Sequence, residues 1–216
     1  MGTGAREHAL VRRLSQDSIP HDLHAAPGNP GMEAHAAIHD VSLGDSAVLT
    51  ALALELGIEL VVIGPEAPLV AGLADDMREA GLTVFGPSKA AAELEGSKDF
   101  AKRIMSEEGV ATARSITVTD PASLEAALDD INPSGSVPYV VKADGLAAGK
   151  GVVVTSSREE ALAHARDCLA SGAHGSRVVL EEYLDGPELS VFCVCDGERA
   201  VPLVPAQDFK LSLIHI

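Results

Sequence analysis

Residues 142–151 are rich in glycine and lysine and are the stretch of this sequence best suited to chemistry. They join two short apolar runs, 139–141 and 152–154, whose β-branched and aromatic residues favour buried strands. The glycines free backbone N–H groups to approach an anion, and the lysines add positive charge. Because charge-assisted hydrogen bonds of this kind suit a polyphosphate, we interpret the stretch as a phosphate-binding flap, with a flexible hairpin turn as the simpler alternative. The residues concerned are Lys142, Gly145, Gly149, Lys150 and Gly151.

A P-loop is the other glycine- and lysine-rich phosphate site to consider. It requires G-x-x-x-x-G-K-[ST] at the start of a helix. Here the spacing from Gly145 to Gly149 is one residue short, Gly151 takes the place of the Ser or Thr, and a strand is expected next. The pattern therefore excludes a P-loop.

The segments before the flap alternate between apolar runs and helical patterns. Residues 60–63 and 83–86 are expected to be strands, each followed by a loop and a helix, the first helix running to about residue 80. Asp45 is expected to cap a helix that runs through Leu56, and Pro87-Ser88 to open the helix after the second strand. Glu66 follows the first strand, where open α/β sheets place ligands, although a helix-start carboxylate is an equally good interpretation. A further helix over residues 97–108 places Lys98 and Lys102 on one face, within reach of a phosphate or simply in solvent.

A glycine turn at residues 2–4 opens the chain and leads into a helix expected to reach about residue 17. A dinucleotide fingerprint would need glycine where Glu7 stands, so the turn alone is a weak signal, but the helix start can hold a phosphate. Such a turn normally follows a strand. We therefore expect the chain to begin just after its first strand.

The segments after the flap are expected to form a helix and further strands. Ser157 and Glu160 predict a capping box, residues 177–184 a strand that runs into a hinge, and residues 189–195 a strand followed by a hairpin. Glu188 precedes that last strand. It can accept hydrogen bonds from ribose hydroxyls or be an exposed charge at a strand end.

Composition limits the class of protein and its partners. The 216 residues are 46% hydrophobic but only 3% aromatic, which favours an α/β protein with a parallel sheet. A net charge of -16 argues against nucleic acid as a partner. Three cysteines, no signal peptide and no apolar run near the ~20 residues of a membrane span indicate a cytoplasmic protein that does not bind membranes. The sequence has no H-E-x-x-H or Cys/His zinc pattern.

Taken in series, several segments resemble the ATP-grasp superfamily and, within it, the phosphoribosylamine–glycine ligase family. The resemblance covers residues 2–210 in order. The segments that carry it are Gly4-Ala-Arg-Glu-His-Ala-Leu10, Ala26-Pro-Gly-Asn-Pro-Gly31, Gly64-Pro-Glu-Ala-Pro-Leu69, Phe85-Gly-Pro-Ser88, Lys142-Ala-Asp-Gly-Leu-Ala-Ala-Gly-Lys-Gly151, Leu180-Glu-Glu-Tyr-Leu184 and Pro205-Ala-Gln-Asp-Phe-Lys210.

The resemblance implies an ATP site. Lys102 and Lys142 would hold phosphates beneath the glycine flap, while Glu188 would bind the ribose. Adenine would lie at the hinge, where the Glu181 carbonyl accepts from its amino group and the Leu184 N–H donates to its ring. The other ATP-binding positions implied are Gly145, Gly149, Lys150 and Gly151.

The resemblance also implies a substrate side and a reaction. The positions that would line the phosphoribosylamine and glycine side are Arg6, Glu7, His8, Glu66 and Asp208. In the family, ATP phosphorylates the glycine carboxylate, and the amine of phosphoribosylamine attacks the resulting glycyl phosphate, giving glycinamide ribonucleotide in purine synthesis. No single catalytic residue is indicated. The Mg²⁺ ligands are expected beyond the last matching residue, so no metal ligand is expected in this chain.

The same resemblance implies a domain division. Residues 1–97 would form a Rossmann-like domain without its first strand, and residues 98–210 an incomplete ATP-grasp domain with a flap subdomain over about 115–187. Residues 211–216 match nothing. We expect a fragment without ligase turnover. Another ATP-grasp carboxylate–amine ligase and a non-catalytic nucleotide-binding module remain alternatives, and the oligomeric state is open.

Overall fold

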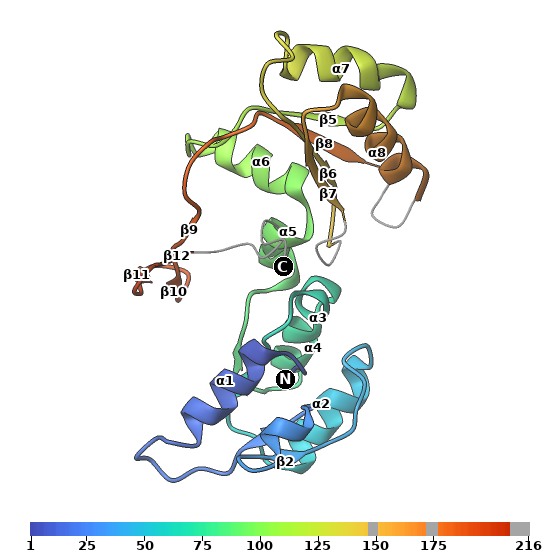
Figure 1. Cartoon of the computed structure of the whole chain (residues 1–216). Coiled ribbons are helices and arrows are strands. Elements are labelled where there is room, and N and C mark those ends of the chain that lie inside the picture. The colour runs from blue at the N-terminus through green and yellow to red at the C-terminus, as the bar shows by residue number, and fades with distance from the viewer. Residues whose placement is uncertain (147–150, 172–176, 208–216) are drawn as a thin grey trace.

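A computed structural model describes residues 1–146, 151–171 and 177–207 of the chain (Figure 1). The predictions made for Gly149, Lys150 and Asp208 lie outside the described residues. Within them, none of the helices combines the length and the apolar character needed to cross a bilayer.

The first part of the chain alternates helices with very short strands. Its elements are α1 (Ala5–Leu14), β1 (His24–Ala25), η1 (Pro30–Met32), β2 (Ala37–Ile38), α2 (Ser46–Glu55), β3 (Val61–Val62), α3 (Glu66–Ala71), α4 (Leu73–Glu79), β4 (Val84–Phe85) and α5 (Lys89–Gly96).

Two helix starts in this part follow from their cap residues, as the sequence predicts. Asp45 accepts a hydrogen bond from the Val48 N–H at the start of α2, and Ser88 accepts one from the Ala91 N–H at the start of α5. The single helix expected up to residue 80 is wrong, because it breaks into α3 and α4 at Gly72. The φ of 110° at Gly72 ends one helix and lets the next begin in a new direction.

The short strands pair in parallel, and the first residues of the chain lie between the two pairs. β1 pairs with β2, and β3 pairs with β4. The Gly2 N–H donates to the Ala26 carbonyl, and the Gly64 N–H donates to the Met1 carbonyl. The glycine turn is therefore hydrogen-bonded to both strand pairs and leads into α1.

The second part of the chain is built on a four-stranded sheet. Its elements are α6 (Lys98–Glu107), β5 (Ser115–Val118), η2 (Pro121–Ser123), α7 (Leu124–Ile131), β6 (Tyr139–Ala143), β7 (Val152–Thr155), α8 (Arg158–Ser171) and β8 (Val178–Glu181). The strand order is β5-β8-β6-β7, and every neighbouring pair is antiparallel.

This sheet corrects three predictions. The parallel arrangement expected from composition holds only for the short pairs near the amino terminus. Strand β7 is an edge strand with Val152 44% and Val154 54% exposed, so it is not the buried strand expected. The capping box at α8 is half formed: Ser157 Oγ accepts from the Glu160 N–H, but the Glu160 carboxylate accepts from Thr155 Oγ1 instead.

Two separate hydrophobic cores support the two parts. One contains buried residues between Ala26 and Ala92, among them Leu49 and Met77. The other lies between the sheet and helices α7 and α8 and contains buried residues between Val118 and Leu180. Helix α5 packs against both α3 and α6, and it lies between the two parts in Figure 1.

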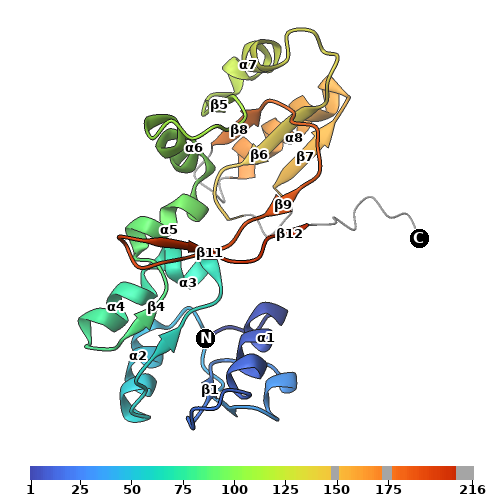
Figure 2. The same cartoon turned by 90° about the vertical axis from the view of Figure 1, so that its left-hand side faces the viewer.

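Two small antiparallel pairs follow the sheet. Strand β9 (Leu189–Ser190) pairs with β12 (Ala206–Gln207), and β10 (Cys193–Cys195) pairs with β11 (Ala200–Pro202). The hairpin predicted at residues 196–197 is confirmed, whereas the single strand predicted over 189–195 is wrong because β9 and β10 have different partners. Figure 2 shows these pairs apart from the four-stranded sheet.

Candidate functional site

Two lysine ammonium groups converge on one buried carboxylate beside the sheet. Lys142 Nζ lies 2.8 Å from Glu181 Oε2, and Lys102 Nζ lies 3.7 Å from the same oxygen. The side chains of Glu181, Lys102 and Lys142 are 9%, 12% and 27% exposed. Lys102 also donates to Thr112 Oγ1 at 2.8 Å and to the Ala113 carbonyl at 2.9 Å, so its position is fixed from two sides.

The pleat of the sheet explains why these side chains meet. Lys142 is paired with Val179 and Val140 with Glu181, so Lys142 and Glu181 are diagonal neighbours on one face. The alternate residues Val141 and Leu180 are fully buried on the opposite face, which packs against α7 and α8. The face that carries Lys142 and Glu181 is therefore left for α6, which lies on the other side of the sheet from α8 in Figure 1.

A groove of about 330 Å³ runs along these residues. Its charged lining comprises three cationic and two anionic side chains, an excess of positive charge in a chain whose net charge is -16. Leu94, Ala101 and Met105 add an apolar wall. The charged lining residues are Glu95, Lys98, Lys102, Lys142 and Glu181.

The predicted ATP residues are only partly brought together. Lys102, Lys142 and Glu181 meet in the groove. Gly145 begins the glycine-rich stretch beside it, and the Gly151 carbonyl accepts from the Ala143 N–H at 2.6 Å across the base of that stretch. Leu184 and Glu188 are exposed on the segment between β8 and β9 and do not line the groove. The hinge roles of Glu181, Leu184 and Glu188 stay predictions.

The predicted substrate-side residues gather around the start of α1. Arg6 Nη2 donates to Glu66 Oε1 at 2.8 Å, and Glu66 opens α3 after the loop that follows β3. The Glu66 backbone N–H, and after it Arg6, hold the pKa of the Glu66 carboxyl below its ordinary value. The hydrogen bond from Arg6 to Glu66 in turn raises the pKa of the Arg6 guanidinium.

This ion pair is exposed and should contribute little stability. Because the folded pKa of Glu66 is lowered, its contribution is present above the unfolded pKa and is lost as the pH falls through the folded value. We expect Glu66→Gln to lower the free energy of unfolding at pH 7 by less than about 1 kcal/mol. Urea unfolding should show the difference shrinking below about pH 4. A difference that grows on acidification would contradict the pairing.

Glu7 lies buried among three glycines at the same helix start. The residue is 7% exposed, and Glu7 Oε2 accepts from the Gly4 N–H at 2.7 Å. Glu7 Oε1 is buried and has no hydrogen-bond partner among the described residues. His8 packs closely against Gly31, where an added Cβ would lie 2.5 Å from His8 Cε1. Arg6 and Glu66 are therefore paired beside the buried Glu7, and His8 lies against Gly31. The substrate roles of all four residues stay predictions.

Sequence reasoning missed several contacts of the groove. It assigned Glu181 a role through its carbonyl, but the carboxylate is the group that meets both lysines. It also gave Asp144 no role, although Asp144 is one of the most deeply buried side chains. The one available signal was its position directly after a buried strand. In the described ranges no group of three or more His, Cys, Asp or Glu side chains is arranged to hold a metal ion.

The fold and the groove define the chain as an ATP-grasp protein. The model for the ATP-grasp (A) domain of phosphoribosylglycinamide synthetase matches residues 96–213. The model for the N domain of the same synthetase matches residues 1–95. The chain therefore belongs to the phosphoribosylglycinamide synthetase family, and the expected fold, a Rossmann-like domain followed by an incomplete ATP-grasp domain, is confirmed.

Individual relatives support the same assignment. The phosphoribosylamine–glycine ligase of Streptomyces coelicolor is 59% identical over 213 residues, which cover 99% of this chain and 49% of that protein. The crystal structure of the phosphoribosylamine–glycine ligase of Thermotoga maritima has a TM-score of 0.76 and 32% identity, and the match covers 94% of this chain and 48% of that one. The chain spans about half the length of the curated relatives it matches.

A more distant solved structure is also similar. The biotin carboxylase domain of 2-oxoglutarate carboxylase from Hydrogenobacter thermophilus, solved with MgADP and bicarbonate, has a TM-score of 0.57 and 25% identity. That match covers 71% of this chain and 35% of the other.

Proposed function

We propose that the groove binds the polyphosphate of ATP. The observation that carries the proposal is the convergence of Lys102 Nζ and Lys142 Nζ on Glu181 Oε2. Two ammonium groups in a partly desolvated groove are suited to phosphate oxygens, because hydrogen bonds between charged groups are stronger than neutral ones. The MgADP complex of the Hydrogenobacter domain is consistent with this use of the fold.

The reaction that we propose is the ATP-dependent ligation of glycine to 5-phosphoribosylamine. The relatives that cover this chain are named for that activity. The glycine carboxylate takes the terminal phosphoryl group of ATP, which gives glycyl phosphate and ADP. The amine of phosphoribosylamine then attacks the acyl carbon and expels phosphate, which gives glycinamide ribonucleotide. The residues described would contribute by positioning and by stabilising charge.

The cluster at the start of α1 is proposed as the phosphoribosylamine and glycine side. Glu7 Oε1 is a buried acceptor without a described partner, which suits a donor such as a substrate amine. Arg6 and Glu66 offer an exposed pair of opposite charges next to it. His8 and Asp208 are proposed for the same side on the basis of the family resemblance alone.

Magnesium, adenine recognition and location are further parts of the proposal. Mg²⁺ would accompany ATP and neutralise phosphate charge, and no described residue is assigned as its ligand. Glu181 and Leu184 would meet adenine through their backbones, and Glu188 the ribose. A cytoplasmic location is proposed because three cysteines, an odd number, make a disulfide framework improbable.

Titration calorimetry of ATP with Mg²⁺ tests the groove directly. We expect the chain to bind ATP and Lys142→Ala to bind it about 10- to 100-fold more weakly, because one charge-assisted hydrogen bond is lost. Lys89→Ala is the matched control. Lys89 is the first residue of α5, and its side chain lies beside Gly72, outside the groove. The ATP affinity of Lys89→Ala should therefore stay within about twofold of that of the parent chain.

Two results would overturn the proposal. The first is ATP binding that Lys142→Ala leaves unchanged, which would place the phosphates elsewhere. The second is an absence of binding by a chain that circular dichroism and cooperative melting show to be folded.

A further inference from the structure

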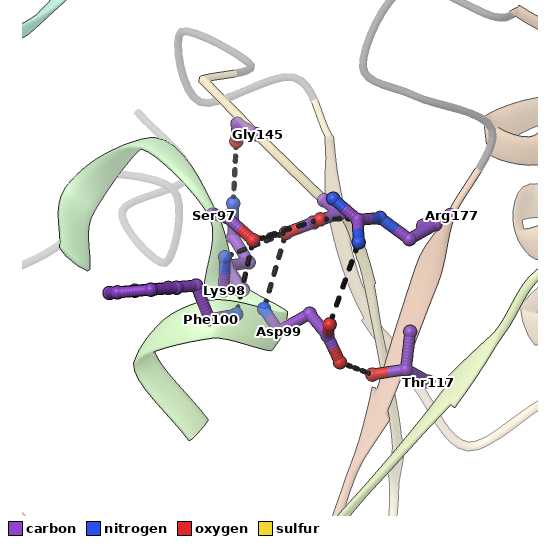
Figure 3. Close-up of polar contacts among 8 residues, drawn as sticks. Ser97, Lys98, Asp99, Phe100, Thr117, Gly145 and Arg177 are labelled. Atoms are coloured by element: carbon purple, nitrogen blue, oxygen red, sulfur yellow. Dashed lines mark hydrogen bonds and ion pairs between the residues drawn. The ribbon is translucent and has the colours of Figure 1, made fainter. Parts of the chain in front are cut away.

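Asp144 is a buried carboxylate at the point where β6 ends and the glycine-rich stretch begins. The residue is 1% exposed. Its Oδ1 accepts from the backbone N–H of Lys98 at 2.6 Å and of Asp99 at 3.3 Å, both in the first turn of α6. Ser97 Oγ lies 3.2 and 3.1 Å from its two oxygens, and Arg177 Nε lies 3.1 Å from Oδ2 (Figure 3).

Arg177 and Asp99 extend these contacts to two further strands. Arg177, which directly precedes β8, also lies 3.6 Å from Asp99 Oδ2 through its Nη1. Thr117 of β5 donates to Asp99 Oδ1 at 2.5 Å. The contacts therefore join α6, β5, the end of β6 and the start of β8 at one place (Figure 3). We call this set the Asp144 junction: Ser97, Lys98, Asp99, Thr117, Asp144 and Arg177.

Capping of α6 does not account for Asp144. The helix already has a local cap, because Ser97 Oγ accepts from the Phe100 N–H at 3.1 Å. By comparison, α2 is capped by the exposed Asp45 through one bond of 3.1 Å to the Val48 N–H. Burying a carboxylate costs desolvation free energy that its partners must offset. Because Asp144 belongs to another element and is buried at this cost, we infer that it does more than cap the start of α6.

The junction fixes the three lysines of the groove relative to one another. Lys98 and Lys102 are one helical turn apart on α6, so an anchor at the first turn of α6 positions both. Lys142 lies on β6, two residues before Asp144, which directly follows that strand. In addition, Lys98 Nζ donates to the Gly145 carbonyl at 2.8 Å, next to Asp144 in the sequence. One carboxylate thus links the helix that carries two of the lysines to the strand that carries the third.

We propose that Asp144 is a positioning residue for the phosphate-binding groove. By holding the first turn of α6 against the end of β6, it sets the spacing between Lys98, Lys102 and Lys142, and Arg177 balances its charge. This role in nucleotide binding rests on the proposed ATP function. The positions of the three lysines can nevertheless be measured without nucleotide.

The test compares Asp144→Asn with the parent chain in the absence of ATP. Lysine acylation followed by mass spectrometry gives a rate for each lysine, and amide hydrogen exchange measured by NMR reports on Lys98 and Asp99. We expect exchange at these two amides to rise about tenfold, and acylation of Lys98 and Lys102 to rise about two- to tenfold, since one to two hydrogen bonds are weakened. Lys89, an exposed residue at the start of α5 and outside the groove, should keep its rate.

Two further variants make the result decisive. Asp45→Asn alters a helix cap away from the groove and should leave the rates of Lys98 and Lys102 unchanged. Arg177→Gln removes the partly exposed cation that contacts Asp144 and Asp99 but keeps the Asp144 carboxylate, so it should give a smaller change in the same two lysines even if Asp144→Asn does not fold.

The outcomes separate positioning from simple stabilisation. Unchanged rates at Lys98 and Lys102 in Arg177→Gln or in a folded Asp144→Asn overturn the proposal. A parallel rise at Lys89 and at the amides of Val141 and Leu180 also overturns it, because it shows general loosening. A failure of the parent chain to bind ATP contradicts the proposed function and leaves these rates as a separate measurement.

Discussion

Leu180→Ala is expected to lower the free energy of unfolding of the second core by about 2–5 kcal/mol while leaving the first core intact. Leu180 is fully buried at the centre of the four-stranded sheet, between β5 and β6, and packs in the core formed with α7 and α8. The other core is formed by residues between Ala26 and Ala92, and the two cores have no buried residue in common. Hydrogen exchange measured by mass spectrometry should therefore show lost protection around Val141 and Val178 but not around Leu49 and Met77.

The same measurement tests the proposed domain boundary near residue 97. Val204→Ala is the control, because Val204 is 86% exposed and its truncation should change stability by no more than about 0.5 kcal/mol. Equal loss of protection in both cores of Leu180→Ala would show that the chain unfolds as one unit, and the division into residues 1–97 and 98–210 would then be wrong.

Local signals in the sequence predicted much of the fold. Asp45 and Ser88 begin helices where expected, because a cap acts through backbone groups two or three residues away. The hairpin at residues 196–197 is equally local: the Glu198 and Arg199 N–H groups both donate to Asp196 Oδ1. Predictions failed where tertiary partners decide the outcome. Residues 189–195 form two strands because their ends pair with different segments, and spacing alone does not reveal that.

The groove shows the same limit for function. Lys142 could be proposed from the sequence because the glycines near it, within one stretch of sequence, are typical of a phosphate site. The carboxylate of Glu181 could not, because its meeting with Lys142 depends on the register of β6 against β8. The contacts of Asp144 could not be predicted either, because they depend on how α6 packs against the end of β6. The residues proposed to bind phosphate were thus more visible in the sequence than the residues proposed to hold them in place.

Gly64→Ala is expected to destabilise the first core by about 1–3 kcal/mol through overpacking against Glu7. An added Cβ at Gly64 would lie 2.5 Å from Glu7 Cγ and 2.8 Å from Glu7 Cδ, distances at which one of the groups must move. The buried Glu7 side chain cannot swing away freely, because Oε2 is held by the Gly4 N–H. Thermal or urea unfolding of the purified variant measures the loss.

A double-mutant cycle with Glu7→Ala identifies the cause. If the Glu7 side chain is what meets the new methyl group, Gly64→Ala should cost less than about 0.5 kcal/mol in the Glu7→Ala background, which gives a coupling free energy of about 0.5–3 kcal/mol. Gly44→Ala is the matched control, since the nearest atom to its added Cβ is Ser42 Oγ at 3.6 Å. An equal cost of Gly64→Ala in both backgrounds would show that something other than the Glu7 side chain makes the substitution destabilising. Close packing against the surrounding glycines would then no longer support the proposal that Glu7 Oε1 is held in place to accept a hydrogen bond from substrate.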